Sequence, residues 1–206
     1  MSKFNLILMS TAVAAIVAGI SMMPKETETP NNLSQSILDK FNRAYPSMAS
    51  DQKANAASII AEATSLGVSD LGQLAYILAT TIGESNVRPI KEYRAAEGTA
   101  LRKTQDAYWY TGYYGRGYVQ LTWKANYEKF AKYLGVDLVG NPDLALNPKY
   151  AAQIIAYGMK NGSFTGKKLS DYISGSKQDF ENARRIINGT DKAATFAGYA
   201  RKILAA

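Results

Sequence analysis

Apolar residues recur every three or four positions through most of this chain, and no other sequence feature constrains its fold as strongly. This spacing places apolar side chains on one face of a helix, and that face must be buried against other elements. No run of alternating strand residues stands out, so we expect a mainly α fold. The pattern predicts helices with apolar residues at 33–41, 56–63 and 71–82, and further helices at 123–134, 148–160, 178–187 and 191–204.

An uncharged stretch at residues 4–23 has the length of a membrane-spanning helix, about 30 Å at 1.5 Å per residue. Lys3 precedes it and acidic residues follow, which weakly favours a cytoplasmic N-terminus. Eight of its twenty residues are Ala, Gly, Ser or Thr, so we expect residues 1–23 to form a weakly held signal anchor. A signal peptide cleaved near Gly19–Ser21 is the alternative.

Residues 24–32 contain two prolines and no large apolar residue, which is typical of a linker, so the folded domain is expected at 33–206. With 24 Lys+Arg against 17 Asp+Glu, the net charge is +7. The first 32 residues carry two charges of each sign, so all of the excess falls on the domain. Such a surface suits an anionic polymer, whether nucleic acid, acidic phospholipid or bacterial envelope.

The chain contains neither cysteine nor histidine. Disulfides, thiol nucleophiles, imidazole bases and nearly all catalytic zinc centres are thereby excluded. No cluster of ligands stands at metal spacing, so we expect no metal and no other cofactor. If the protein is an enzyme, carboxylates are its available acids and bases.

Glu84 is the first candidate acid, in the last turn of the third expected helix. Thr81, Thr80 and Ile77 share its face, so the carboxyl group lies off the fully solvated side. Contact with apolar surface disfavours the charged form, as a general acid requires. The alternative is a solvated residue at a helix end, where its charge opposes the helix dipole at a small cost.

Residues 85–122 form a long segment rich in glycine and tyrosine, and loops of this length are usually functional. Seven of the fourteen tyrosines and both tryptophans fall between residues 93 and 127. Sugar rings stack on aromatic faces, so this density indicates a glycan groove, although core packing is equally favoured for Trp123 and Tyr127. A groove for single-stranded nucleic acid stays open. The candidate groove residues are Tyr108, Trp109, Tyr110, Tyr113 and Tyr114.

A glycosidase needs a second carboxylate, which in an inverting enzyme activates water about 6.5 to 9.5 Å from the acid. Glu92, Glu97 and Asp106 are the candidates. Glu92 is favoured because Ile90 and Tyr93 can anchor its loop, whereas Glu97 lies in a small, polar stretch and a base must be held in place. Further along, Gln120 and Thr122 would point the same way from an extended strand.

The block YYGRGYVQLTWKANYEKF at 113–130 and the turn NPDLALNP at 141–148 resemble glycoside hydrolase family 19, the class of plant-type chitinases. They are most similar to its bacteriophage and bacterial lysozyme-like branch. Gly83-Glu84-Ser85, NARRIING at 182–189 and AGYARK at 197–202 add to the resemblance, which covers about residues 70–204. It implies a lysozyme-like helical domain with the Tyr/Gly-rich segment along its cleft.

The resemblance also implies roles for individual residues. Glu84 matches the general acid, and Glu92 falls where the water-activating carboxylate is expected. Two departures stand out: Gly83 replaces the family's histidine, and the spacing from Glu84 to Glu92 is shorter than in chitinases. Gln120, Thr122 and Asn126 match polar residues that hold substrate and catalytic water, with Tyr113 and Tyr114 beside them and with Arg185 and Asn188 lining or bracing the cleft.

These observations predict a monomeric peptidoglycan hydrolase that cleaves the bond joining N-acetylmuramic acid to N-acetylglucosamine. It resembles a phage endolysin of signal-anchor-release type, exported in the host, tethered to the inner membrane through residues 4–23 and free of nucleic-acid partners. A chitinase of the same fold is the enzymatic alternative, although muramic acid carries a carboxylate that suits the positive charge. A non-catalytic wall-binding or virion structural protein is the alternative from another class.

Overall fold

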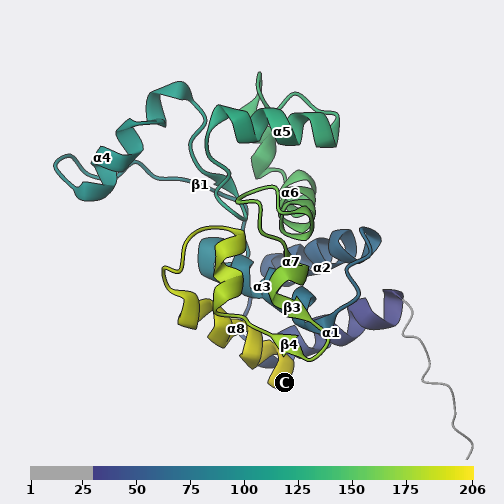
Figure 1. The fold of residues 1–206 in the computed structure, drawn as a ribbon. Coiled ribbons are helices and arrows are strands. Elements are labelled where there is room, and N and C mark those ends of the chain that lie inside the picture. Colours follow the sequence, from purple (N-terminus) through teal and green to yellow (C-terminus); the bar gives the residue numbers. More distant parts are fainter. Residues whose placement is uncertain (1–29) are drawn as a thin grey trace, which may run out of the picture.

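Helix α3 (Leu71–Ser85) runs through the centre of the computed structural model, which describes residues 30–206 (Figure 1). The helix begins where the Asp70 carboxylate accepts a hydrogen bond from the Gln73 backbone N–H at 3.1 Å. Residues 74–79 are all fully buried. A helix that is apolar on every side must be enclosed by other elements, so this stretch determines where the core lies.

Four longer helices surround α3, and their amphipathic faces build the rest of the core. They confirm the mainly α, lysozyme-like fold, and each coincides with a helix expected from the apolar spacing. Two hydrogen bonds from α1 hold the end of α8: Lys40 Nζ donates to the Leu204 carbonyl at 3.0 Å, and Arg43 Nε donates to the Ala206 carbonyl at 2.8 Å. The four are α1 (Pro30–Ala44), α2 (Ser50–Ser65), α6 (Pro148–Asn161) and α8 (Ala193–Ala205).

Shorter elements carry the chain between these helices. Two antiparallel pairs of two-residue strands are formed, β1 with β2 and β3 with β4. The strands are β1 (Ile90–Lys91), β2 (Arg116–Gly117), β3 (Ile173–Ser174) and β4 (Lys177–Gln178); the helices are α4 (Ala100–Asp106), α5 (Lys124–Leu134), α7 (Leu169–Tyr172) and the 3₁₀ helices η1 (Trp109–Thr111), η2 (Pro142–Leu146) and η3 (Asn182–Ile186).

The α-helix expected at 178–187 is wrong, because this segment forms part of β4 and then the 3₁₀ helix η3. The Asp179 carboxylate accepts hydrogen bonds from the Asn182 backbone N–H at 3.2 Å and its side-chain amide at 2.9 Å. Such local side-chain bonds compete with α-helical pairing and favour a tight turn. This turn determines which of two neighbouring arginines reaches the interior.

At the N-terminal side, α1 begins at Pro30, so residues 30–32 of the expected linker are already helical. The expected anchor at residues 1–23 and linker residues 24–29 lie outside the described part of the chain. Within residues 30–206, no helix has both the length and the apolar character needed to cross a membrane.

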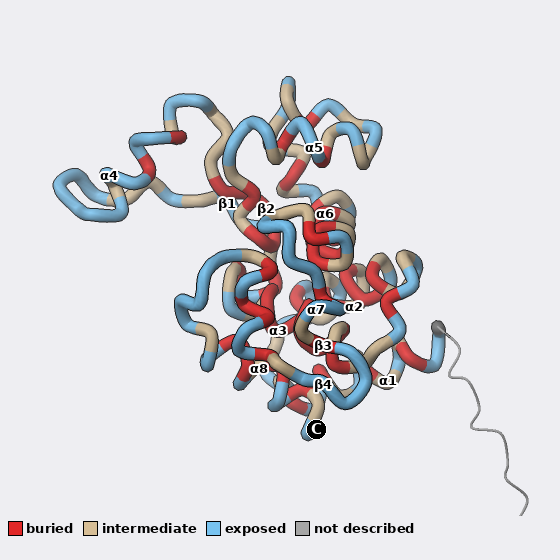
Figure 2. The backbone as a smooth tube through the Cα atoms, viewed as in Figure 1, coloured by how far each residue is buried: buried red, intermediate tan, exposed pale blue. Residues whose placement is uncertain are grey.

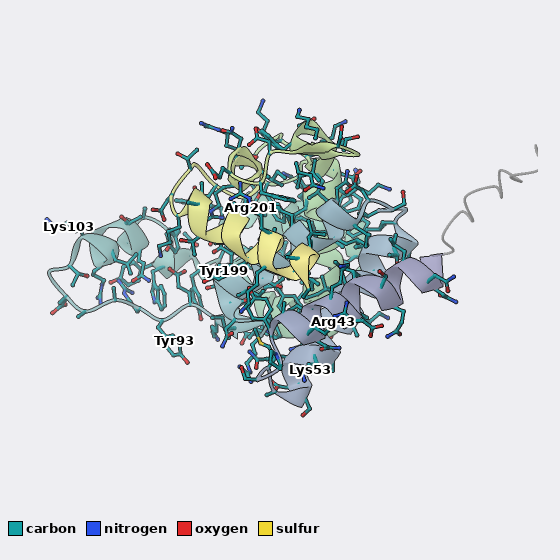
Figure 3. All side chains as sticks on the ribbon, turned by 90° about the horizontal axis from the view of Figure 1, so that it is seen from below. Arg43, Lys53, Tyr93, Lys103, Tyr199 and Arg201 are labelled. Carbon is teal, nitrogen blue, oxygen red and sulfur yellow. The ribbon has the colours of Figure 1, made fainter. Side chains whose placement is uncertain are left out.

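Residues 93–112, here named the α4 lobe, stand out from the rest of the domain (Figure 1). Most of the lobe surface is exposed, with a few buried positions inside it (Figure 2). Tyr93 and Lys103 project from it into solvent (Figure 3). Helix α4, which the sequence pattern missed in a segment expected to be irregular, is only seven residues long and is capped by the Thr99 hydroxyl.

Candidate active site

A pocket of about 300 Å³ lies where the end of α3, the start of α5 and the turn after η3 meet. Six of the residues singled out from the sequence line it, although they come from segments about 100 positions apart. The larger pocket, about 620 Å³, lies at the other end of α3 and contains none of them. The lining residues of the smaller pocket are Glu84, Val119, Gln120, Leu121, Thr122, Trp123, Asn126, Phe164, Ile187 and Asn188.

Glu84 enters the pocket from the last turn of α3, as expected. The helix ends directly afterwards because Asn86 and Val87 adopt the left-handed conformation, with φ of 49° and 56°. The Glu84 side chain is 19% exposed, and its Oε1 lies 2.6 Å from a guanidinium nitrogen of Arg184. The expectation that apolar surface dominates its surroundings is therefore wrong, because a buried charge of opposite sign contacts the carboxylate.

Arg184 is a site residue that the sequence analysis missed. Its side chain is only 6% exposed, and its Nε donates to the Asp191 carbonyl at 3.1 Å. Its guanidinium also lies 4.2 Å from the centre of the Phe196 ring. These contacts hold the positive charge against Glu84 and brace the pocket wall.

Arg185, the arginine selected from the sequence, is exposed and donates to Asn182 Oδ1 at 3.4 Å. Adjacent residues in a 3₁₀ helix point about 120° apart, so only one of the pair can face the interior. The assignment of Arg185 to the cleft is therefore wrong. The doubled arginine in NARRIING was the available signal, and sequence alone did not distinguish its two members.

Gly83, the position where the family carries histidine, packs directly against the aromatic ring of Phe196. A Cβ atom at Gly83 would lie 2.4 Å from Phe196 Cε1, closer than packed carbon atoms approach. Phe196 is itself 2% exposed and covered by the Arg184 guanidinium. A side chain at position 83 would therefore compete with the Phe196 ring for the same space.

We expect Gly83→Ala to lower the free energy of unfolding by about 1 to 3 kcal/mol, because Phe196 has to move away from Arg184. Gly198→Ala on α8 is the matched control, since a Cβ there meets no atom within 4 Å. It should leave stability unchanged or raise it by about 0.5 to 1 kcal/mol. Urea unfolding of both variants measures the difference, and equal stabilities would contradict the packing described.

Glu92 follows β1 and is held by three donors. Its Oε1 accepts hydrogen bonds from Gln105 Nε2 at 2.9 Å and from the Tyr108 hydroxyl at 2.7 Å, and its Oε2 accepts one from the Gly115 backbone N–H at 2.8 Å. Burial and the bond to Glu92 together raise the pKa of Tyr108, so this hydroxyl keeps its proton and remains a donor. These contacts hold the loop around Glu92, but the expected anchors are wrong, because Ile90 is 38% exposed and Tyr93 is 88% exposed.

The other two candidate carboxylates are placed differently. Glu97 is exposed and makes no hydrogen bond or ion pair with the described residues. Asp106 contacts Arg94 at 2.6 Å and Arg102 at 3.2 Å within the α4 lobe. Neither carboxylate lines the pocket.

Gln120 joins Glu92 to the pocket. Its Nε2 donates to the Ile90 carbonyl at 2.9 Å, and a Cβ at Gly115 would lie 2.9 Å from Gln120 Oε1 and 3.1 Å from Glu92 Oε2. Glu92 itself does not line the pocket, but its carboxylate and the Gln120 side chain both lie against Gly115. Gly115 therefore permits a close approach between the glutamine and the carboxylate.

Thr122 and Asn126 line the pocket beside Gln120. Thr122 Oγ1 donates to the Gln120 carbonyl at 2.9 Å, and Asn126 Nδ2 donates to the Thr122 carbonyl at 2.8 Å. The expected extended strand is wrong, because Gln120 has a φ of 53° and lies in a turn. The turn still brings the three polar side chains to one wall.

Asn188 closes the opposite side of the pocket, and its backbone N–H donates to the Arg184 carbonyl at 3.1 Å. This bond ties it to the arginine that contacts Glu84. The placement agrees with the expectation that Asn188 lines the cleft.

Among the aromatic candidates, Trp123 is the one that lines the pocket, with half of its surface exposed. Tyr127 is fully buried in the core, so the two interpretations given for this pair hold for one residue each. The Trp123 ring meets the Tyr108 ring edge-on, with centroids 5.2 Å apart. An exposed tryptophan face beside polar side chains suits a sugar ring.

The other aromatic candidates lie outside this pocket, and all of them except Tyr110 pack against another aromatic ring. Tyr113 donates its hydroxyl to the Val139 carbonyl at 3.1 Å, and the Tyr114 ring stacks on Trp109 at 4.4 Å. Tyr108 holds Glu92, and Tyr110 is 78% exposed with the Arg94 guanidinium 4.4 Å from its ring. None of these five aromatic residues lines the pocket, Tyr113 and Tyr114 included.

Arg116 stabilises the Tyr/Gly-rich segment from inside. Its side chain is 5% exposed and contacts Asp143 Oδ1 at 2.6 Å, while NH1 donates to the Gly112 and Tyr114 carbonyls. Partial burial opposes ionisation of Asp143, but the hydrogen bonds from Arg116 and Lys91 outweigh it and lower the pKa of this carboxyl group. The pair fastens η2 to β2.

Because the pKa of Asp143 is lower in the folded protein, the ionised carboxylate stabilises the fold at pH values above its unfolded-state pKa of about 3.9. This stabilisation is lost as the pH falls through the folded-state pKa. We expect Asp143→Asn to cost about 1 kcal/mol at pH 7, a figure reduced because the carboxylate is 52% exposed. Unfolding measured from pH 7 to pH 2.5 should show the gap between the two proteins closing below about pH 4. A gap that persists at low pH would contradict this origin.

No group of three or more Asp or Glu side chains among residues 30–206 is arranged to hold a metal ion. The chemistry available in the described pocket is that of carboxyl, hydroxyl, amide and guanidinium groups.

Comparison with known proteins adds a sequence match over the central block. Residues 91–159 match the glycoside hydrolase family 19 model, described as chitinase class I. An endochitinase of Arabidopsis thaliana is 37% identical over 78 residues, covering 37% of this chain and 25% of the relative. Chitinase 8 of Oryza sativa subsp. japonica is 62% identical over 32 residues, covering 16% and 12%. The matched part spans a quarter or less of these relatives.

Solved structures agree with the fold over a larger part of the chain. The crystal structure of a bacterial family 19 chitinase aligns with a TM-score of 0.54 at 19% identity, covering 80% of this chain and 93% of that one. Chitinase C from Streptomyces griseus aligns with a TM-score of 0.50 at 17% identity, covering 80% and 90%. The fold similarity therefore extends beyond residues 91–159, while Glu84, Arg184 and Asn188 lie outside the sequence match.

Proposed function

We propose that the chain, whose residues 91–159 match the glycoside hydrolase family 19 model, hydrolyses the glycan strands of peptidoglycan, with Glu84 as general acid and Glu92 as the water-activating base. The observation that carries this proposal is the convergence of Glu84, Thr122 and Asn126 on one pocket, together with a second carboxylate, Glu92, that three donors hold in place. Two carboxylates are the minimum that glycoside hydrolysis requires.

In this mechanism Glu84 protonates the oxygen of the leaving sugar, and the C–O bond breaks as positive charge develops on the ring. Glu92 takes a proton from the water that attacks the anomeric carbon, and Thr122 and Asn126 orient that water. Arg184 holds the Glu84 side chain in place and offsets its charge once the proton has left. Trp123 supplies an apolar face for one sugar ring.

The choice of peptidoglycan over chitin rests on charge. The domain carries the whole net charge of +7, and peptidoglycan presents the lactyl carboxylate of muramic acid and carboxylates of its peptides, whereas chitin is neutral. The second candidate is chitin, because the relatives and the two solved structures are named as chitinases.

A pair of activity gels distinguishes these candidates, one containing purified bacterial cell walls and the other glycol chitin. Clearing of the cell-wall gel with little clearing of glycol chitin is the expected result, and the opposite pattern would favour chitin. Clearing of neither gel by a folded protein would contradict hydrolysis and favour a wall-binding or virion structural protein that keeps the groove.

We also propose that the domain works outside the cytoplasm, tethered to the inner membrane of the host by residues 4–23, as a monomeric endolysin. The support is the uncharged twenty-residue stretch with its charged flanks. N-terminal sequencing of the membrane-associated protein tests this proposal: a start at residue 1 or 2 supports an anchor. A start just after Ser21 would show a cleaved signal peptide.

A further inference from the structure

Two of the three donors that hold Glu92 come from the α4 lobe. Gln105 and Tyr108 both donate to Glu92 Oε1, while the remaining oxygen is held from β2's side by the Gly115 N–H. Gln105 is fully buried and Tyr108 is 8% exposed, although the lobe around them is mostly exposed. The two buried side chains of this protruding segment therefore both bind one carboxylate.

The bonding of Gln105 is complete. Its Nε2 also donates to the Tyr93 carbonyl at 2.8 Å, and its Oε1 accepts the Ala95 backbone N–H at 2.7 Å. A buried amide costs free energy unless each of its groups finds a partner, so an apolar side chain would fill this position more simply. The glutamine instead joins α4 by hydrogen bonds to the backbone of residues 93–95, which follow β1, and to the carboxylate of Glu92.

We propose that Gln105 and Tyr108 are positioning residues for Glu92, so that the α4 lobe acts as a clamp on the orientation of the base. This inference rests on the proposed function, in which Glu92 activates water. Turning the carboxylate would break both bonds to Oε1 together, whereas Oε2 accepts one N–H and keeps acceptor capacity for water. Holding the base in one orientation raises the reaction rate, because the carboxylate is already placed to take a proton from the attacking water.

Tyr108→Phe is the cleanest test, because it removes the hydroxyl and keeps the ring against Trp123. With the full-length protein, acting on whichever of the two gel polymers it hydrolyses, we expect kcat to fall about tenfold with KM changed less than twofold. A purely structural role would not separate the effect on kcat from the effect on KM in this way.

Gln105→Met should act in the same direction, and limited proteolysis within residues 93–112 reports whether the lobe has lost its fold. Tyr133→Phe is the matched control, because Tyr133 stacks on Tyr157 away from the pocket. It should leave kcat and KM unchanged.

A double-mutant cycle with Glu92→Gln decides whether Tyr108 acts through Glu92. In that background, Tyr108→Phe should change the residual rate less than twofold. A tenfold loss from Tyr108→Phe in the Glu92→Gln background would overturn the clamp alone. So would an unchanged kcat in the Tyr108→Phe single variant when Glu92→Gln by itself is impaired. Wild-type activity in Glu92→Gln would instead overturn the role of Glu92, and the clamp with it.

Discussion

Replacing Glu84 with glutamine is expected to lower glycan hydrolysis by about 10² to 10⁴-fold, because the amide keeps the shape of the side chain but cannot donate the proton. The same change leaves the guanidinium of Arg184, which is 6% exposed, without its counter-charge. We therefore also expect a loss of about 1 to 3 kcal/mol in the free energy of unfolding. Initial rates should be measured well below the unfolding temperature, so that the two effects stay separate.

Glu181→Gln is the matched control for this prediction. Glu181 also pairs with an arginine, Arg201, at 3.2 Å, but both side chains are more than half exposed. An exposed pair contributes at most about 1 kcal/mol, so activity should be unchanged and stability nearly so. If Glu84→Gln retained more than a tenth of the activity, Glu84 would not be the general acid.

Glu92→Gln is expected to lower turnover by about 10²-fold or more and Glu97→Gln by less than twofold. The three groups around the Glu92 carboxylate are all donors, so the amide NH₂ of a glutamine must face at least one of them and break its bond. Glu97 is exposed and makes no such bonds among the described residues. The loss should be smaller than for Glu84, because Thr122 and Asn126 still orient the water.

The comparison requires kcat and KM for both variants on the same polymer, with substrate binding largely kept in each. If Glu97→Gln proved the more damaging, the assignment of the base would be wrong and Glu92 would serve only to fasten the α4 lobe.

The helical core and the position of Glu84 were both predictable from the sequence. Apolar periodicity located α1, α2, α5, α6 and α8, because each of these helices buries one face and its apolar residues recur about every 3.6 positions; it also located α3, in which residues 74–79 are buried on every side. Apolar periodicity did not predict α4, because a helix of seven residues has too few turns for a period to show. It did not predict η3 either, because side-chain hydrogen bonds to Asp179 favour a tight turn there. The left-handed turn at Gln120 escaped it as well, because glutamine seldom adopts a positive φ.

What the sequence by itself determined is the longer helices, the carboxylate at the end of α3 and the resemblance of the central block to glycoside hydrolase family 19. Only the tertiary structure decided that Arg184 rather than Arg185 meets Glu84 and that Gln105 and Tyr108 hold Glu92. It also decided that most of the aromatic candidates pack on one another while Trp123 faces the pocket. The physical reason is range: periodicity reports contacts within a helix, whereas the partners of Glu84 and Glu92 lie 13 to 100 residues away in the sequence. The direction of such a side chain depends on how the intervening chain is packed.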